Sequence, residues 1–269
     1  MTEVDELALC AADRAWLGVE LDETARRGSV VLRGLHLTPM ARLYGGAGTA
    51  IAAVMAEAAT GRRLRWLTVQ FVRSAAEGDQ LDLHVEVLAS GRRSSQVQVT
   101  ARVAGDLVLN AIGATGEGLD LVPDRTVPAM PHVPPPEECP AFRPAVRDLS
   151  YLGYLGCCEM RNADPEGRRR KTWWMRFMGH PASRPAMLSM VADALPGVIM
   201  RVIGQRGAGS SLDNTVRVGQ APLSDWVLFD GDPDQAAGSF GHGTARVWTP
   251  DGSLAGVASQ TAALWTRWD

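Results

Sequence analysis

The chain has 269 residues, a formal net charge of −3 at pH 7, 46% hydrophobic and 21% charged residues, a composition typical of a globular chain. The near-neutral charge gives no support to a nucleic-acid partner, and no apolar run is long enough to predict a membrane span. An acidic N-terminus without the basic region of a signal peptide, and four cysteines without a Cys-x-x-Cys pair, favour a reduced, cytoplasmic protein.

The first half of the chain alternates between helix and strand patterns. Residues 6–17 predict a short helix, and residues 29–37 predict a strand that ends before Pro39. Residues 43–60 place small apolar residues every three or four positions, which predicts a helix whose face another element can approach closely. Period-two or continuous apolar runs then predict four strands, at 67–71, 81–87, 97–103 and 107–112.

A proline-rich stretch separates the first half from a second half with the same order of elements. Residues 117–147 contain eight prolines and predict a stiff linker between an N-terminal repeat, 1–116, and a C-terminal repeat, 148–269. The second repeat predicts a strand, then a helix that Pro196 interrupts or kinks, then four strands, at 171–178, 185–199, 212–218, 226–229, 243–248 and 254–264. An internal repeat of this size indicates a fused pseudo-dimer in which the two sheets continue one another.

Short motifs in the order of this repeat resemble the acyl-CoA thioesterase II family, the tandem double-hotdog thioesterases. The family carries Phe-Gly-Gly, an Asp-His-Ser-like strand start, a Trp-Leu-Leu-Tyr-like strand, and an Asp-Gly turn before a strand ending in Gln. The matching stretches here are Tyr44-Gly45-Gly46, Ser211-Leu212-Asp213-Asn214-Thr215, Trp226-Val227-Leu228-Phe229, Asp251-Gly252 and Ser259-Gln260. The resemblance covers about residues 25–265 and implies an α+β double hotdog, with each repeat wrapping a long antiparallel sheet around a central helix.

The resemblance also implies a chemistry, the hydrolysis of an acyl-CoA thioester by a water that an Asp, a Thr and a Gln position. Asp213 matches the Asp, and Gln260 matches the Gln. The Thr position falls at Asp234, with Gln235 one step away, so this chain departs from the family there. A carboxylate can accept the proton of an attacking water while a carboxamide orients that water.

Further candidates come from the two predicted helices. Backbone N–H groups at a helix start can polarise a carbonyl, and Ala186 and Met187 are the donors that follow Pro185 in the second helix. Gly45 and Gly46 could hold a phosphate or a pantetheine amide, although close helix–sheet packing explains them more simply. Asp193 either lies in a cleft that raises its pKa, or it points to solvent or bonds a neighbouring strand. Met190, with Met187, could border an apolar acyl tunnel.

Three function classes remain open from the sequence. The first is an acyl-CoA thioesterase of lipid metabolism, and the second is a non-catalytic protein that binds acyl-CoA or an acyl carrier. The third, a hotdog hydratase or dehydratase, needs a His paired with a carboxylate, and no histidine here is well placed for that. No metal cluster, Ser-His-Asp spacing or dinucleotide loop is evident, so we expect no cofactor, acyl-CoA as the partner, and a homo-oligomer as an open expectation.

Overall fold

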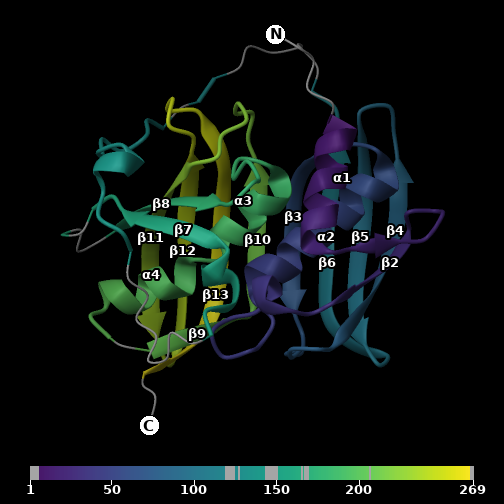
Figure 1. The fold of residues 1–269 in the computed structure, drawn as a ribbon, viewed down its shortest axis with the longest axis horizontal. Coiled ribbons are helices and arrows are strands. Elements are labelled where there is room, and N and C mark those ends of the chain that lie inside the picture. The colour runs from purple at the N-terminus through teal and green to yellow at the C-terminus, as the bar shows by residue number, and fades with distance from the viewer. Residues whose placement is uncertain are drawn as a thin grey trace.

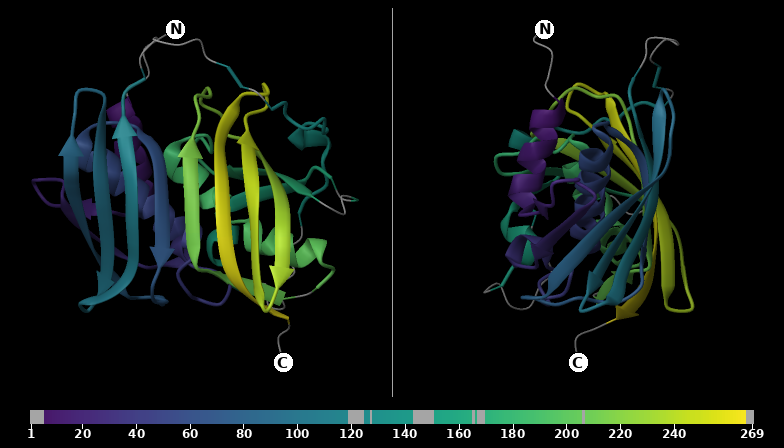
Figure 2. Two further views of the ribbon diagram at one scale, coloured as in Figure 1. Left: turned by 180° about the vertical axis from the view of Figure 1, so that it is seen from behind. Right: turned by 90° about the vertical axis from the view of Figure 1, so that its right-hand side faces the viewer.

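The computed structural model describes residues 6–118, 125–126, 128–142, 151–164, 166, 170–205 and 207–266. Its central feature is a single antiparallel sheet of 13 strands that runs through both halves of the chain. The strand order is β1-β2-β4-β5-β6-β3-β10-β13-β12-β11-β8-β7, and β9 pairs with β13. The sheet curves, and its helices all lie on the concave side (Figure 1, Figure 2). This is the double-hotdog fold that the repeat predicts.

The first half contributes two helices and six strands. In chain order these elements are α1 (Glu6–Leu17), β1 (Glu20–Leu21), β2 (Arg27–Val31), α2 (Gly45–Thr60), β3 (Leu64–Phe71), β4 (Gln80–Ser90), β5 (Ser94–Val103) and β6 (Asp106–Gly116). Helix α2 is buried from Gly46 to Glu57, and Gly61 follows it in the left-handed conformation, as the sequence predicts.

The second half contributes two helices and seven strands. These elements are β7 (Cys158–Asn162), β8 (Lys171–Phe177), α3 (Pro185–Ala192), α4 (Leu195–Val202), β9 (Gly207–Ser211), β10 (Asp213–Val218), β11 (Val227–Ala237), β12 (Phe240–Trp248) and β13 (Leu254–Thr266). The helix predicted at 185–199 is broken after Ala192, and Pro196 lies in the first turn of α4, where a missing N–H is tolerated.

The two halves join where β3 pairs with β10. Thr68 lies opposite Thr215, and their hydroxyl oxygens are 3.0 Å apart. Leu67 faces Val216 and Val69 faces Asn214, so the register is symmetric about the Thr68–Thr215 pair. The halves are therefore related by a pseudo-two-fold axis at this pair, and each residue of β3 has a counterpart on β10.

The predicted strand at 29–37 is too long. Strand β2 ends at Val31, and residues Gly34–His36 form a 3-10 helix instead. The buried His36 ring fixes this turn, because its Nδ1 accepts the backbone N–H of Arg33 at 3.1 Å and its Nε2 lies 2.9 Å from the carbonyl oxygen of Leu17. Local side-chain bonds of this kind override a weak strand pattern.

The proline-rich stretch packs on the outer face of the second half. Trp174 donates its indole N–H to the carbonyl oxygen of Pro134 at 2.8 Å. A second apolar cluster forms beneath this stretch from Cys139, Ala163, Trp174, Leu228 and Trp248. The described part of the linker is thus a cover for the sheet as well as a connection between the halves.

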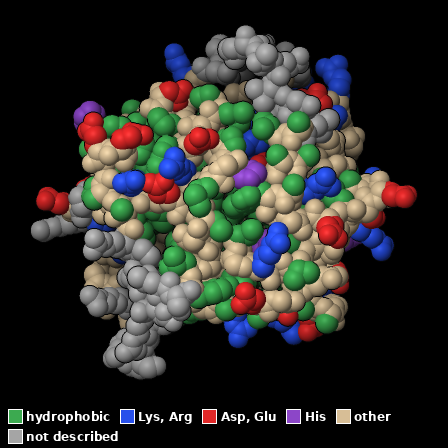
Figure 3. Space-filling model, viewed as in Figure 1, with side chains coloured by type: hydrophobic (Ala, Val, Ile, Leu, Met, Phe, Trp, Pro, Cys, Tyr) green, Lys and Arg blue, Asp and Glu red, His purple; other side chains and the backbone are tan. Residues whose placement is uncertain are grey.

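One helical segment of the second half has the length and composition of a membrane span. The helical stretch Pro185–Val202 is long and apolar enough to cross a bilayer by length and composition, contrary to the expectation from the sequence. Of this stretch, 83% is buried inside the molecule, as the core helix of a globular fold is. Helix α3 packs against α2 and the sheet, and α4 packs against β9, β11, β12 and β13. The helix-bearing surface shows apolar side chains interrupted by charged ones (Figure 3).

Candidate active site

The carboxylate of Asp193 lies where the start of α2 meets the break between α3 and α4. Its Oδ2 accepts the backbone N–H of Gly46 at 2.7 Å, and the residue is only 5% exposed. A Cβ on Gly45 would stand 2.7 Å from the same Oδ2, so only glycine lets the helix start approach this closely. The Gly-Gly pair therefore serves close packing and carboxylate binding together.

Two side chains from the sheet complete the environment of Asp193. Ser211, the last residue of β9, donates its hydroxyl to Oδ1 at 2.7 Å. The Nε2 of Gln260, on the concave face of β13, donates to the same Oδ1 and, at 2.8 Å, to the Ser211 hydroxyl oxygen. A carboxylate, a hydroxyl and a carboxamide thus form one buried cluster, which we call the Asp193 cluster: Asp193, Ser211, Gln260 and the N–H of Gly46.

The Asp193 cluster holds a carboxylate whose affinity for a proton is raised. Burial raises the pKa of Asp193 to about 6, and the bonds from Ser211, Gln260 and Gly46 hold the pKa below the value that burial alone would give. The nearby Asp213 carboxylate adds to the rise. A pKa near the operating pH is the property that general acid–base chemistry needs.

Of the candidates predicted from the sequence, Gln260 and Asp193 are brought together, and Asp213 lies beside them. Asp213, half-buried at the start of β10, accepts the backbone N–H of Thr261 at 2.7 Å through its Oδ1. Within the described residues, no hydrogen bond joins the side chains of Asp213 and Gln260. The Asp213 side chain is thus engaged in holding β10 to β13.

Asp234 and Gln235 lie outside the cluster. Both are exposed, at an irregularity in the pairing of β11 with β12. In this register Pro233 on β11 faces Gly243 on β12, and Gly243 faces Gln260 on β13. Asp234 and Gln235 therefore lie two strands away from the cluster. The hydroxyl beside Asp193 and Gln260 belongs to Ser211. This residue lies in the motif matched at 211–215, but the sequence predicted no role for it.

Ala186 and Met187 begin α3 at the opposite end of the helix pair. Helices α2 and α3 run antiparallel, since the start of α2 meets Asp193 while its end meets Arg184, the residue before α3. Met190 lies nearer the cluster, and its carbonyl oxygen accepts the Tyr44 hydroxyl at 2.7 Å. The side chains of Ala186, Met187 and Met190 are all buried in the core.

The first half carries no copy of the Asp193 cluster. The pseudo-two-fold axis that relates Thr68 to Thr215 relates Ser211 to Leu64, and it relates Gln260 to Gly113 on β6. A carboxylate does stand at the corresponding end of α2, that of Glu57, which accepts the backbone N–H of Leu64. Leu64 and Gly113 supply neither the hydroxyl nor the carboxamide, so the described part of the first half holds no copy of the cluster.

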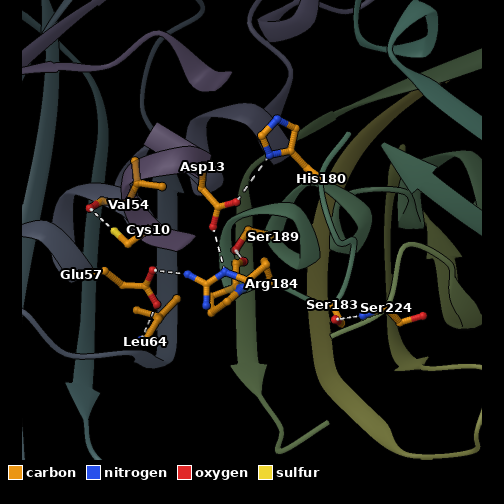
Figure 4. A network of polar contacts seen from close by, with 11 residues as sticks. Cys10, Asp13, Val54, Glu57, Leu64, His180, Ser183, Arg184, Ser189 and Ser224 are labelled. Carbon is orange, nitrogen blue, oxygen red and sulfur yellow. Dashed lines mark hydrogen bonds and ion pairs between the residues drawn. The ribbon is translucent and has the colours of Figure 1, made fainter. Parts of the chain in front are cut away.

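An ion-pair network fills the corresponding end of the first half (Figure 4). The Arg184 guanidinium lies 3.0 Å from Asp13 of α1 and 3.5 Å from Glu57 of α2, and all three side chains are nearly inaccessible. Glu57 also accepts the backbone N–H of Leu64 at 2.8 Å. We call these residues, Asp13, Glu57 and Arg184, the Arg184 network. Sequence reasoning missed it, because its partners are 44 to 171 residues apart along the chain.

Within the described residues, neither a set of metal ligands nor a groove over β2, β4 and β5 offers a site that competes with the Asp193 cluster. Among the described residues, no group of three or more His, Cys, Asp or Glu could hold a metal ion. A groove lined by Arg27, Asp82, His84 and their neighbours lies over β2, β4 and β5 of the first half, remote from Asp193. None of the residues that line this groove belongs to the Asp193 cluster.

Comparisons with known proteins give the cluster its context. Residues 36–116 match the model of the acyl-CoA thioesterase N-terminal domain, and residues 127–264 match the acyl-CoA thioesterase C-terminal domain. No curated protein matches the chain in sequence.

Solved structures agree along nearly the whole chain. A thioesterase candidate from Novosphingobium aromaticivorans is 30% identical, with a TM-score of 0.84 over 91% of this chain and 98% of that one. The tesB protein of Mycobacterium avium subs paratuberculosis is 23% identical, with a TM-score of 0.78 over 96% and 99%. Acyl-CoA thioesterase II TesB2 of Mycobacterium marinum is 16% identical, with a TM-score of 0.75 over 95% and 98%. The last two support the fold alone.

Proposed function

The chain belongs to the acyl-CoA thioesterase family, with one family domain in each half, and we propose that it hydrolyses an acyl-CoA thioester at the Asp193 cluster. The observation that carries the proposal is a buried carboxylate with a raised pKa, bonded by a hydroxyl, a carboxamide and a helix N-terminus. These are the groups that the family resemblance implies for positioning a water. Asp193, rather than Asp213, supplies the carboxylate, and Ser211 supplies the hydroxyl.

Each group has a distinct part in the reaction that we propose. Asp193 accepts a proton from water as the water oxygen attacks the thioester carbon. Gln260 and Ser211 hold the carboxylate in place through their bonds to Oδ1. Collapse of the tetrahedral intermediate breaks the carbon–sulfur bond, and the protonated Asp193 returns a proton to the departing thiolate. The products are the free acid and coenzyme A.

The start of α2 supports the developing charge on the carbonyl oxygen. The first N–H groups of a helix have no acceptor within the helix, and the helix dipole places partial positive charge there. In α2 the N–H of Gly46 is bonded to Asp193, so the donors that remain for an oxyanion are those of Gly45 and Ala47. An oxyanion held at this end lies next to Asp193, which Gly46 already contacts, so base and oxyanion donors converge on one place.

A non-catalytic acyl-CoA binding protein is the second candidate. The Asp193 carboxylate is almost fully buried, and both of its oxygens already accept bonds from the protein. Three of the roughly four acceptor positions of the carboxylate are filled by the protein, so one position, on Oδ2, is left for a water, and burial limits access to it. A chain that binds acyl-CoA at the helix N-terminus without hydrolysing it is consistent with the same contacts.

Thiol release from a panel of acyl-CoA thioesters tests the proposal. We expect wild-type activity and a loss of about 10²–10⁴-fold in Asp193→Asn, the contribution usual for a general base. Asp213→Asn is the matched control, because it makes the same change in a carboxylate next to the cluster, and its loss should be far smaller.

Two results would overturn this assignment. A folded Asp193→Asn protein with wild-type activity would show that another group is the base, and a larger loss in Asp213→Asn would identify that group. Acyl-CoA binding without thiol release from any thioester would favour the second candidate.

A further inference from the structure

Asn214 is a buried polar residue that the fold leaves without partners. Its side chain is 0% exposed, and neither its Nδ2 nor its Oδ1 makes a hydrogen bond. Asn214 lies on β10, three residues after Ser211, and it faces the helices together with Val216, whereas Thr215 between them faces the other side of the sheet. A buried carboxamide without partners loses the hydrogen bonds that it makes in water.

Gln260 shows the same deficiency next to Asn214. Its Nε2 is used fully, on Asp193 and Ser211, but its Oε1 is buried and has no donor. The register of β10 with β13 pairs Thr215 with Ser259, so Asn214 and Gln260 come next on these strands, facing the same side. Side chains directly across an antiparallel pair have Cβ atoms about 4.5–5.5 Å apart. Three unpartnered polar atoms therefore lie together beside the reacting groups.

The fold itself does not require a polar residue at this position. The counterpart of Asn214 across the pseudo-two-fold axis is Leu67, which is fully buried in the apolar core. The counterpart of Gln260 is Gly113, so the first half has neither carboxamide. The three atoms therefore lie beside the Asp193 cluster, at positions where the first half has no polar side chain.

The chemistry of two of these atoms, one donor and one acceptor, defines which group can bridge them. The Nδ2 of Asn214 is a donor, and the Oε1 of Gln260 is an acceptor. A hydroxyl group can accept from the first and donate to the second at once, whereas a methylene can do neither and a carbonyl can only accept. An apolar acyl chain that passed over Asn214 would leave these atoms buried without bonds.

Building on the proposed function, we propose that the substrate is an acyl-CoA with a hydroxyl on its acyl chain near the thioester, bound between Asn214 and Gln260. Asn214 is then a residue that determines specificity. A site built to bond a hydroxyl discriminates strongly against an analogue that lacks it, since the buried groups are left unpaired. We expect kcat/KM for the best positional isomer of hydroxybutyryl-CoA to exceed that for butyryl-CoA by about tenfold to a hundredfold.

Replacement of Asn214 tests whether this residue produces the preference. In Asn214→Leu, which installs the residue of the first half, the ratio of the two kcat/KM values should fall to about one. Asn110→Leu is the matched control, because Asn110 lies on β6 of the first half and its Oδ1 is already bonded by Gln98 at 2.7 Å. The ratio in that variant should equal the wild-type ratio. Thermal unfolding of both variants checks that they fold.

Each alternative gives a different result. Equal wild-type kcat/KM for every hydroxylated and plain pair would overturn this inference, leave the proposed function intact, and indicate that an ordinary water satisfies the three atoms. Calorimetry with analogues in which a methylene replaces the thioester sulfur separates binding from hydrolysis. Tighter binding of the hydroxylated analogue without any thiol release would uphold the inference and overturn the proposed function. If Asn214→Leu does not fold, the wild-type ratios alone decide.

Discussion

At the scale of single residues, the assignment of Asp193 as the base predicts a pH dependence of the activity. Because burial raises its pKa to about 6, the carboxylate is protonated below that pH and cannot accept a proton from water. We expect kcat/KM of the wild-type protein to rise with pH through about 6 and then to level off. The bond from Ser211 lowers this pKa, so Ser211→Ala should move the rise to higher pH as well as reduce the rate. A pH–rate profile of both proteins measures the shift.

Ser210→Ala is the control for that shift. Ser210 precedes Ser211 on β9 and is exposed, so its removal should leave the pH profile in place. An unchanged profile in Ser211→Ala would contradict the assignment of Asp193 as the base, because the group that titrates would then not be the one that Ser211 contacts.

His36 gives stability a pH dependence of its own. Burial lowers the pKa of His36 to about 4 from an ordinary value of 6.5. Between these values the unfolded chain binds a proton that the folded protein does not, so this contribution is complete above pH 6.5 and is lost as the pH falls toward 4. The full loss is about 3 kcal/mol of unfolding free energy. Asp193, whose pKa is raised, acts in the opposite direction over the same range.

Comparison with His36→Gln separates the two groups, because both proteins retain Asp193. Urea unfolding at pH 7 and at pH 4.5 should show the wild-type protein losing stability relative to the variant as the pH falls. A difference between the two proteins that is the same at both pH values would mean that burial does not hold His36 neutral in this pH range.

The sequence predicts part of the site at this scale, and the reasons are physical. Gln260 and Asp193 stand out as polar residues in apolar patterns. Whether Ser211 or Asp213 contacts Asp193 and Gln260 depends on the break at Leu212, where the chain passes from β9 to β10. A strand pattern shows which residues share a face, but it does not show which of two neighbouring segments reaches a helix end contributed by the other half.

At the scale of elements, the Arg184 network fastens α1 to the helix pair. Arg184 contacts Asp13 and Glu57 in a region where all three side chains are nearly inaccessible. Arg184→Met would leave two buried carboxylates without their cation, and breaking a buried ion pair in this way usually costs about 3–5 kcal/mol. We therefore expect a large fall in the unfolding free energy, measured by urea titration at pH 7.

Arg73→Met is the matched control for the network. Arg73 pairs with Asp106 at 2.6 Å, but both side chains are 61% exposed, and such pairs contribute at most about 1 kcal/mol. Similar effects of the two substitutions would show that the buried carboxylates of the Arg184 network find other partners or become protonated at little cost. Burial already raises the pKa of Glu57.

Most long elements were predictable from the sequence, whereas the shortest strands were not. The exception among the long ones is β11 (Val227–Ala237), of which the pattern at 226–229 predicts only the start. The pattern at 43–60 differs from α2 by only two residues at its start, and the predicted strands near β4, β5, β10 and β13 fall at their observed places. Strands β7 and β9 have five residues each and carry no strong alternation, so nothing local identifies them. Their positions depend on pairing with β8 and β13, which are contacts between distant parts of the chain.

At the scale of the whole molecule, one sheet makes the two halves a single functional unit. The Asp193 cluster takes the N–H of Gly46 from the first half and its three side chains from the second. The first half has Leu64 and Gly113 where the second has Ser211 and Gln260, and the Arg184 network occupies its helix end. Each half therefore supplies what the other lacks, and the pairing of β3 with β10 sets their relative position.

Dividing the chain tests this dependence. A cut after Gly118 leaves β1 to β6 on one fragment, and it leaves β7 to β13 with the covering segment around Pro134 on the other. Each fragment alone exposes an edge strand, β3 or β10, and a helix face that the partner normally buries, so we expect both to be insoluble or to self-associate. Neither fragment should release thiol from acyl-CoA, because neither holds both Gly46 and Asp193. Co-expressed fragments should purify as a one-to-one complex with thioesterase activity restored. Activity in the second fragment alone would show that the start of α2 is dispensable and that the donors for the thioester lie within residues 119–269.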